Sequence, residues 1–160
     1  MSKKNFDKLM MLQALDEARL AYEKDEVPVG AVVTFDDKII AKAHNQTEGD
    51  SDPSAHAEVL AIRRAAKVIG DWRLNEATLY TTLEPCLMCA GALLLARIGR
   101  VVYAAPDLRH GANGSLMNVF EVKHPTHTAQ IEGGLLEEEA AHLMREFFKM
   151  QRMRNEQTTR

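Results

Sequence analysis

Cysteine is scarce in this sequence: only two of its 160 residues, Cys86 and Cys89, are cysteines. Two cysteines cannot supply the several disulfides that stabilise small secreted proteins, so the sequence disfavours that class. No segment approaches the roughly 20 consecutive apolar residues of a membrane-spanning helix. No long apolar run follows the lysines of the first ten residues, so a signal peptide is not indicated. We therefore expect a cytoplasmic protein without a membrane segment.

An excess of positive charge is also missing. The net charge is −3, which argues against a general nucleic-acid-binding protein, because such proteins usually carry a basic surface. The segment 144–160 is a local exception, with five Arg or Lys against two Glu, and it follows the acidic run LLEEE at 135–139. Charge alone favours the interpretation that both runs are solvated faces of one helix.

Repeats, low-complexity segments and long linkers are absent too, and 46% of the residues are hydrophobic. We therefore expect residues 1–160 to form a single domain with one sizeable core. Apolar periodicity and capping residues predict helices at 5–23, 54–69, 86–99 and 135–155. Strands are predicted at 27–35, 38–45, 77–83, 100–105 and 127–133, with a tight turn at Asp36–Asp37 between the first two. Because helices and strands alternate after this hairpin, we expect an α/β fold with a mixed five-stranded sheet flanked by helices.

The two cysteines form the motif Pro85-Cys86-x-x-Cys89 at a predicted helix start. A lone C-x-x-C is compatible with a redox pair, half of a zinc site or ordinary packing. Thiols at positions i and i+3 share one helix face, so they could bind one ion together. The helix N-terminus also favours the thiolate form. A redox pair would fit this position equally well.

A second predicted helix start, SAHAEVLAI, contains His56 and Glu58. A lone histidine is usually a capping or core residue. If the two helices stem from neighbouring strands, however, their N-termini lie side by side, and His56 completes a His-Cys-Cys set with Cys86 and Cys89. Three protein ligands leave the fourth position of a tetrahedral zinc open for water, as in catalytic sites. The sequence therefore indicates a catalytic zinc site, with a structural zinc module as the alternative.

Glu58 lies two residues after His56, so its side chain points in a different direction and can face the pocket instead of the metal. A carboxylate beside a metal-bound water can take its proton and pass it to a leaving group. The alternative is a first-turn glutamate that interacts favourably with the helix dipole. Beside His56 and the cysteine motif, we favour the catalytic role for Glu58.

The combination of H-A-E with P-C-x-x-C resembles the zinc-dependent nucleoside and nucleobase deaminases. Within that superfamily, several segments resemble the bacterial tRNA-specific adenosine deaminases, among them EVPVGAVV, DPSAHAEVLAIR, WRLNEATLYTTLEPCLMCAGALLLARIGRVVYAA, GANGSLMN and EFFKMQRMR. The resemblance runs from about Val27 to Arg154. It implies a three-layer α/β/α cytidine-deaminase-like fold and a homodimer. It also implies hydrolytic deamination of the wobble adenosine of a tRNA anticodon stem-loop to inosine by a zinc-activated water.

The resemblance also assigns residues. It implies that His56, Cys86 and Cys89 hold Zn²⁺ and that Glu58 moves protons. It further implies a substrate-binding role for residues outside the zinc set; these are Asn45 at the ribose, Val29 and the Ala57 backbone around the flipped base, Asp107 near the anticodon backbone, and Phe148, Lys149, Arg152 and Arg154 on the last helix. An ordinary amphipathic end-helix is the alternative for that segment.

The loop APDLRHGANGS departs from the family pattern. Pro106 stands where arginine is expected before Asp107, and Arg109-His110 stands where Lys-Thr is more usual. A deaminase of free bases or nucleosides such as guanine, cytosine or cytidine therefore remains an alternative. Such an enzyme would use the same zinc set and Glu58, but it would not need the basic and aromatic segment EFFKMQRMR.

Overall fold

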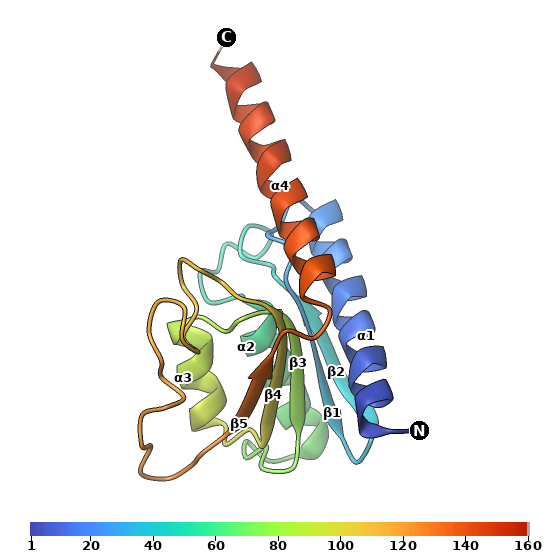
Figure 1. The fold of residues 1–160 in the computed structure, drawn as a ribbon, viewed down its shortest axis with the longest axis vertical. Helices are drawn as coiled ribbons and strands as arrows, with labels where there is room; N and C mark the ends of the chain where they lie inside the picture. Colours follow the sequence, from blue (N-terminus) through green and yellow to red (C-terminus); the bar gives the residue numbers. More distant parts are fainter. Residues whose placement is uncertain (160) are drawn as a thin grey trace.

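The computed structural model describes residues 1–159, which form one mixed sheet with helices on both of its faces (Figure 1). The helices are α1 (Lys3–Glu23), α2 (Ala57–Ile69), α3 (Leu87–Leu95) and α4 (Glu137–Thr158). The strands are β1 (Gly30–Phe35), β2 (Lys38–His44), β3 (Thr78–Leu83), β4 (Arg100–Ala105) and β5 (Gln130–Gly133). Among the residues described, no helix is both long and apolar enough to cross a membrane.

The strand order in the sheet is β2-β1-β3-β4-β5. The pairs β1–β2 and β1–β3 are antiparallel, whereas β3–β4 and β4–β5 are parallel. Asp36 and Asp37 both have positive φ angles, 51° and 56°, as a two-residue type I′ hairpin turn requires. The structure thus confirms the predicted hairpin and the mixed five-stranded sheet.

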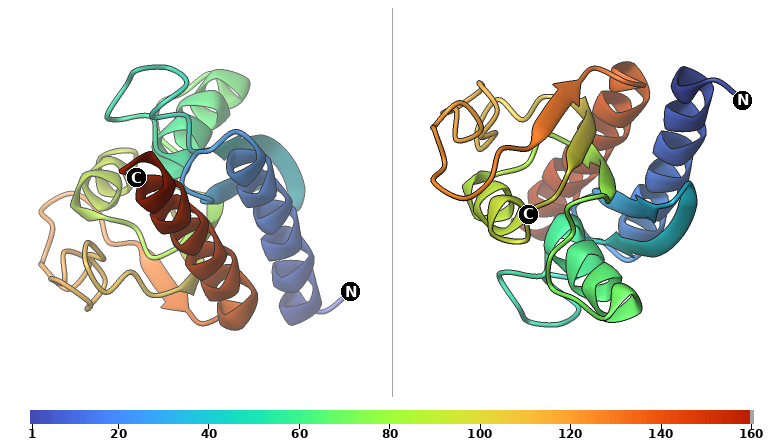
Figure 2. Two further views of the ribbon diagram at one scale, coloured as in Figure 1. Left: turned by 90° about the horizontal axis from the view of Figure 1, so that it is seen from above. Right: turned by 90° about the horizontal axis from the view of Figure 1, so that it is seen from below.

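Two apolar cores lie on the opposite faces of this sheet, because side chains alternate between faces along each strand. Val33 packs in the core with Ala61 of α2, while Val32 packs in the other core with Met11 of α1. Figure 2 shows α2 and α3 on one face and α1 and α4 on the other. This is the three-layer α/β/α arrangement expected from the sequence.

Several element boundaries differ from the prediction. Helix α2 begins at Ala57 and its N-cap is His56, while Ser54 instead donates both its N–H and its hydroxyl to Asp52 in a separate turn. Helix α3 ends at Leu95, well before Gly99, because the chain must turn back at residues 96–99 to enter β4. The fifth strand is limited to its last four predicted residues.

A buried ionic network ties α1 to the sheet. Asp7 accepts hydrogen bonds from the Tyr80 hydroxyl at 2.6 Å and from both terminal nitrogens of Arg100 at 2.8 and 2.6 Å. Arg100 also donates to Glu132 on β5. The hydrogen bond from Arg100 is the main reason why the pKa of Asp7 is lowered. The Asp7 carboxylate therefore links α1 to β3 and β4, and Arg100 extends the network to β5.

Replacing Asp7 by asparagine is expected to lower the free energy of unfolding by about 3 kcal/mol, because it leaves Arg100 without its buried partner. Asp16→Asn is the matched control, since Asp16 lies on the exposed side of the same helix and, within residues 1–159, pairs with Arg19 alone. Urea unfolding measures both variants. Equal losses in the two variants would contradict the structural role of Asp7.

The same network predicts how stability depends on pH. Because the folded pKa of Asp7 is lower than its unfolded value, its contribution is present above the ordinary carboxyl pKa of about 4. It is lost as the pH falls through the lower folded pKa. The stability difference between the wild type and Asp7→Asn should therefore shrink below about pH 4.

Candidate metal and catalytic centre

The N-termini of α2 and α3 meet on one face of the sheet. They do not follow neighbouring strands, because β1 lies between β2 and β3. They converge because both helices pack on the same face. His56 is the N-cap residue of α2, Cys86 is the N-cap residue of α3, and Cys89 lies in the first turn of α3.

This convergence brings three potential metal ligands together. The Nδ1 atom of His56 lies 3.6 Å from Cys86 Sγ and 3.5 Å from Cys89 Sγ, and all three ligand atoms lie within 4.8 Å of one another. Around a tetrahedral zinc with ordinary bond lengths, a nitrogen and a sulfur ligand are about 3.5 Å apart. The donor types and their spacing therefore fit Zn²⁺.

The protonation state of Cys86 also fits metal binding. Hydrogen bonds from Cys89 and from His56 lower the pKa of Cys86 to about 4. The interaction with Cys86 and the burial of its thiol raise the pKa of Cys89, and the hydrogen bond with Cys86 raises the pKa of His56. Cys86 is therefore a thiolate at neutral pH, the form that ligates metals.

Glu58 is buried beside this group, with 4% of its surface exposed. Its Oε2 accepts a hydrogen bond from the Cys89 thiol at 3.2 Å, and its Oε1 accepts one from the Thr81 hydroxyl at 3.1 Å. Burial raises the pKa of Glu58. Glu58 therefore points inward to the cysteines and is not a solvent-facing residue of the first helical turn.

Thr81 was missed by the sequence analysis. It lies in the centre of β3, is fully buried, and also approaches the carbonyl oxygen of Leu83 at 3.3 Å. A threonine in a strand is ordinary, since its branched side chain suits a sheet. The only available signal was the strand alternation, which places Thr81 and Leu79 on the face that α2 and α3 cover.

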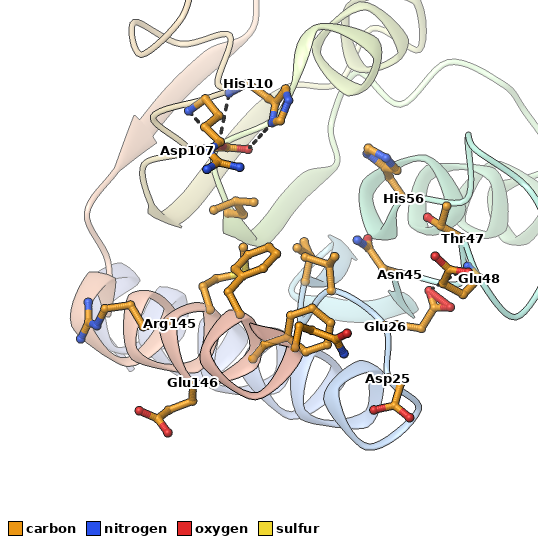
Figure 3. A pocket seen from close by; sticks show the side chains of 18 of the residues that line it. Asp25, Glu26, Asn45, Thr47, Glu48, His56, Asp107, His110, Arg145 and Glu146 are labelled. Atoms are coloured by element: carbon orange, nitrogen blue, oxygen red, sulfur yellow. Dashed lines mark hydrogen bonds and ion pairs between the residues drawn. The ribbon is translucent and has the colours of Figure 1, made fainter. Parts of the chain in front are cut away.

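An open cleft of about 1730 Å³ leads from the His-Cys-Cys group to the surface. His56, Glu58 and Cys86 line its base. Its walls come from Leu83 and Glu84 and from residues of four segments, which are 24–29, 45–48, 107–110 and 144–155. Figure 3 shows His56 and Asn45 on one side, Asp107 and His110 across from them, and α4 along a third side. A ligand much larger than a single base could therefore contact several of these segments at once.

Of the substrate-binding residues expected near the reacting base, all but Ala57 line this cleft. Val29 and Asn45 line it. The Asn45 side chain accepts the Ala57 N–H at 2.8 Å, so it holds the start of α2 in place. Ala57 is fully buried and its N–H is used by Asn45. Asp107 lines the cleft, but its carboxylate accepts the backbone N–H groups of Arg109 and His110.

The expected residues of α4 also line the cleft: Phe148, Lys149, Arg152 and Arg154. Phe148 is 42% exposed and packs edge-on against Phe147. Arg154 pairs with Asp25 at 2.5 Å, whereas Lys149 and Arg152 form no ion pair within residues 1–159. Arg160, counted above in the basic segment, lies outside the described residues. The helix therefore presents free cations and an aromatic ring to the cleft.

Comparisons with known proteins agree with this geometry. The sequence model of the MafB19-like deaminase family matches residues 5–152. The tRNA-specific adenosine deaminase of Bacillus subtilis strain 168 is 48% identical over 143 residues, which cover 89% of each protein. The comparisons therefore place the deaminase resemblance over nearly the whole chain.

Solved structures give the same result. A structure from a study of A-to-I editing by tRNA:A34 deaminases at the wobble position of transfer RNA has a TM-score of 0.78 and 45% identity, covering 84% of this chain and 97% of that one. A Bacillus subtilis guanine deaminase has a TM-score of 0.60 and 40% identity, covering 66% of each chain. The cytidine-deaminase-like fold is thus confirmed, and the chain belongs to the family of tRNA-specific adenosine deaminases.

Proposed function

We propose that this protein converts the wobble adenosine of a tRNA anticodon to inosine by hydrolytic deamination. The observation that carries the proposal is the cleft that joins the His-Cys-Cys group and Glu58 to the exposed cationic and aromatic side chains of α4. A single free nucleobase would fill only the bottom of this cleft. An anticodon loop presents splayed bases together with a phosphate backbone, so it could occupy both ends.

His56, Cys86 and Cys89 would hold Zn²⁺, because their donor atoms match its preferred ligands and spacing. When bound, zinc lowers the pKa of a water molecule and so supplies the nucleophile for hydrolysis. Three protein ligands leave room for that water. The N-cap positions of His56 and Cys86 fix two of the ligands at rigid helix starts.

Glu58 would act as the general base and then as the general acid. Its carboxylate is buried against the cysteines, and burial raises its pKa, which favours a group that alternately holds and releases a proton. It would take a proton from the attacking water and deliver it to adenine N1. A second proton would go through Glu58 to the departing 6-amino group, so that water and adenosine give inosine and ammonia.

The remaining residues would bind the substrate. Asn45 and Val29 line the cleft beside Ala57, the first residue of α2, where the flipped base and its ribose would lie. On α4, Phe148 offers a ring for stacking, and Arg152 lies on the cleft where a phosphate could bind. Asp107 would shape the opposite rim. This arrangement predicts binding that weakens as the salt concentration rises.

The direct test is inosine formation in an anticodon stem-loop with adenosine at the wobble position, measured by nucleoside mass spectrometry. The matched control is the same RNA with its only loop adenosine moved into the base-paired stem. We expect inosine from the first RNA and none from the second. If folded, zinc-loaded protein forms no inosine in the first RNA, the proposal is refuted.

A deaminase of free bases is the second candidate, favoured by the 40% identity to a guanine deaminase structure and by the altered loop at 106–110. Guanine, cytosine and cytidine are therefore tested in parallel with the RNA. Ammonia release from one of them, without inosine in the RNA, would retain the roles of the zinc ligands and Glu58 and would change the substrate.

Thr81→Val is expected to lower kcat by about tenfold while KM changes by less than about twofold, because only the orientation of Glu58 is affected. Thr82→Val is the matched control: Thr82 is the next residue, is also buried, and accepts the Gly30 N–H on the opposite face of β3. A similar fall in kcat for both variants would indicate general destabilisation.

We also propose that the chain acts as a single cytoplasmic deaminase domain and assembles as a homodimer. The family match over residues 5–152 supports the single domain. Exposed apolar side chains on the short helix α3, Leu87 and Leu95, support an interface there. Light scattering at micromolar concentration should give twice the chain mass of 17.9 kDa. A monomeric mass would contradict the dimer.

A further inference from the structure

The irregular segment 106–119, which follows β4, forms one rim of the cleft. Its first part, Asp107–His110, lines the cleft, and the chain then folds back on itself. The N–H of Gly111 donates to the Asp107 carbonyl, and the N–H of Val119 donates to the Ala112 carbonyl. These bonds close the segment locally, but they do not fix it to the rest of the protein.

Glu84 supplies that attachment. It is the residue after β3 and is 2% exposed. Its Oε1 accepts hydrogen bonds from the Asp107 N–H at 3.2 Å and the Ser115 hydroxyl at 2.5 Å. Its Oε2 accepts from the N–H groups of Asn113 at 2.8 Å and Ser115 at 3.4 Å. One buried carboxylate therefore holds both ends of a nine-residue stretch.

All four groups around this carboxylate are donors, and no Lys, Arg or His forms a salt bridge with Glu84 within the described residues. A carboxylate is acceptor-only on both oxygens, so it satisfies donors on both sides. A glutamine of the same shape would have to turn its NH₂ group toward two of them. The site is therefore specific for a carboxylate.

The backbone is packed tightly over Glu84 at Gly111. A Cβ atom on Gly111 would lie 2.2 Å from Glu84 Oε2 and 2.3 Å from its Cδ, so any side chain there would displace the carboxylate. Gly111 also forms a β-bridge with Cys86, and the next N–H, that of Ala112, donates to the Pro85 carbonyl at 2.8 Å. The rim is thus attached at Glu84, Pro85 and Cys86, the stretch that carries one zinc ligand.

The other end of the rim faces the cleft. Asp107 uses its own carboxylate to accept the N–H groups of Arg109 and His110, as Figure 3 shows for His110. This turn leaves the side chains of Arg109 and His110 exposed. Because Glu84 binds the Asp107 N–H, the position of both exposed side chains relative to the zinc ligands depends on Glu84.

We propose that Glu84 is a positioning residue that fixes the 106–119 rim and thereby determines substrate affinity, with little effect on the chemical step. The inference rests on the proposed function and assigns to Glu84 the recognition of RNA outside the reacting base. Glu84 lines the cleft beside Cys86 but is almost fully buried, and it acts on the rim through its hydrogen bonds with Asp107, Asn113 and Ser115.

The test compares Glu84→Gln with the milder Ser115→Ala, which removes only one donor. Glu121→Gln is the matched control, because Glu121 is an exposed glutamate that follows the same segment. Three quantities are measured: amide hydrogen exchange of peptides covering 107–117, zinc bound per chain, and KM and kcat for the anticodon stem-loop.

In Glu84→Gln we expect amide exchange in 107–117 to become about tenfold faster. KM should rise about tenfold, while kcat changes less than about threefold. Zinc content should stay at the wild-type value. Ser115→Ala should show smaller changes in the same direction, and Glu121→Gln should match the wild type.

Unchanged exchange in 107–117, or a fall in kcat at constant KM, would overturn the inference, as would loss of zinc in both Glu84→Gln and Ser115→Ala. These outcomes are distinct from failure of the proposed function, which would appear as a wild-type protein that forms no inosine. The exchange measurement needs no substrate, so it tests the attachment of the rim in either case.

Discussion

Glu58→Gln is expected to lower the rate of inosine formation by about 10³-fold, within the range that general acid–base catalysis contributes. Glutamine keeps the shape of the side chain and can still accept the Thr81 hydroxyl at Oε1. Its NH₂ group cannot take a proton from water or deliver one to the base. Zinc binding should remain, because His56, Cys86 and Cys89 are unchanged. The variant therefore separates proton transfer from metal binding.

The matched control is Glu48→Gln, the same substitution at an exposed glutamate that lines the same cleft. It should keep the wild-type rate within about twofold, since Glu48 lies away from the reacting base. Single-turnover rates at saturating RNA measure the chemical step directly. A Glu58→Gln rate within tenfold of wild type, at full zinc content, would show that another group transfers the proton.

The pairing of the two cysteines in the His-Cys-Cys group was predictable from the sequence because their positions are set by local features. Cys86 and Cys89 are separated by one helical turn, and a proline precedes them at a helix start. His56 required a tertiary assumption, namely that two helix N-termini converge. The two N-termini do converge, but for a different reason from the one expected. The helices pack on the same face of the sheet and do not follow adjacent strands.

The supporting residues were not predictable, because their roles depend on contacts far apart in the sequence. In the sequence, Thr81 is an ordinary strand residue. Its role follows only from the hydrogen bond with Glu58, which is 23 residues away in the chain. In the sequence, Glu84 is simply the residue before the Pro85-Cys86-x-x-Cys89 motif. Its partners are donors in the loop 23 to 31 residues later, which only the fold brings to its carboxylate. No local pattern carries such pairings. Only the fold brings a buried carboxylate to four donors.

Asp107 illustrates a different limit of prediction from sequence. The resemblance assigns it to the RNA, and it does lie on the cleft, but its carboxylate is engaged with the backbone of its own loop. A sequence match identifies the position without the direction of the side chain. The neighbouring Arg109 and His110 are exposed, and so is Pro106, and these are the three residues that differ from the family pattern. Any change in substrate preference is therefore expected to originate at these three positions.

Cys89→Ser is expected to abolish zinc binding and, with it, deamination. Cys89 is fully buried, and its sulfur lies 3.5 Å from His56 Nδ1, so no exposed side chain can take its place. A serine hydroxyl is not ionised at neutral pH and is a poor zinc ligand. Bound zinc, measured by mass spectrometry of the purified protein, should fall from about one per chain to less than about 0.1.

The same variant should nevertheless fold, because a serine hydroxyl is smaller than the thiol and can still donate to Glu58 Oε2. Its melting temperature should therefore match that of the wild type after metal removal by a chelator, and should lie below that of the zinc-loaded wild type. Met88→Ala is the matched control, since Met88 lies between the two cysteines with 39% of its surface exposed. It should keep both zinc and activity. Full zinc content in Cys89→Ser would refute the ligand role, and a melting temperature below that of the metal-free wild type would show that Cys89 is needed for folding itself.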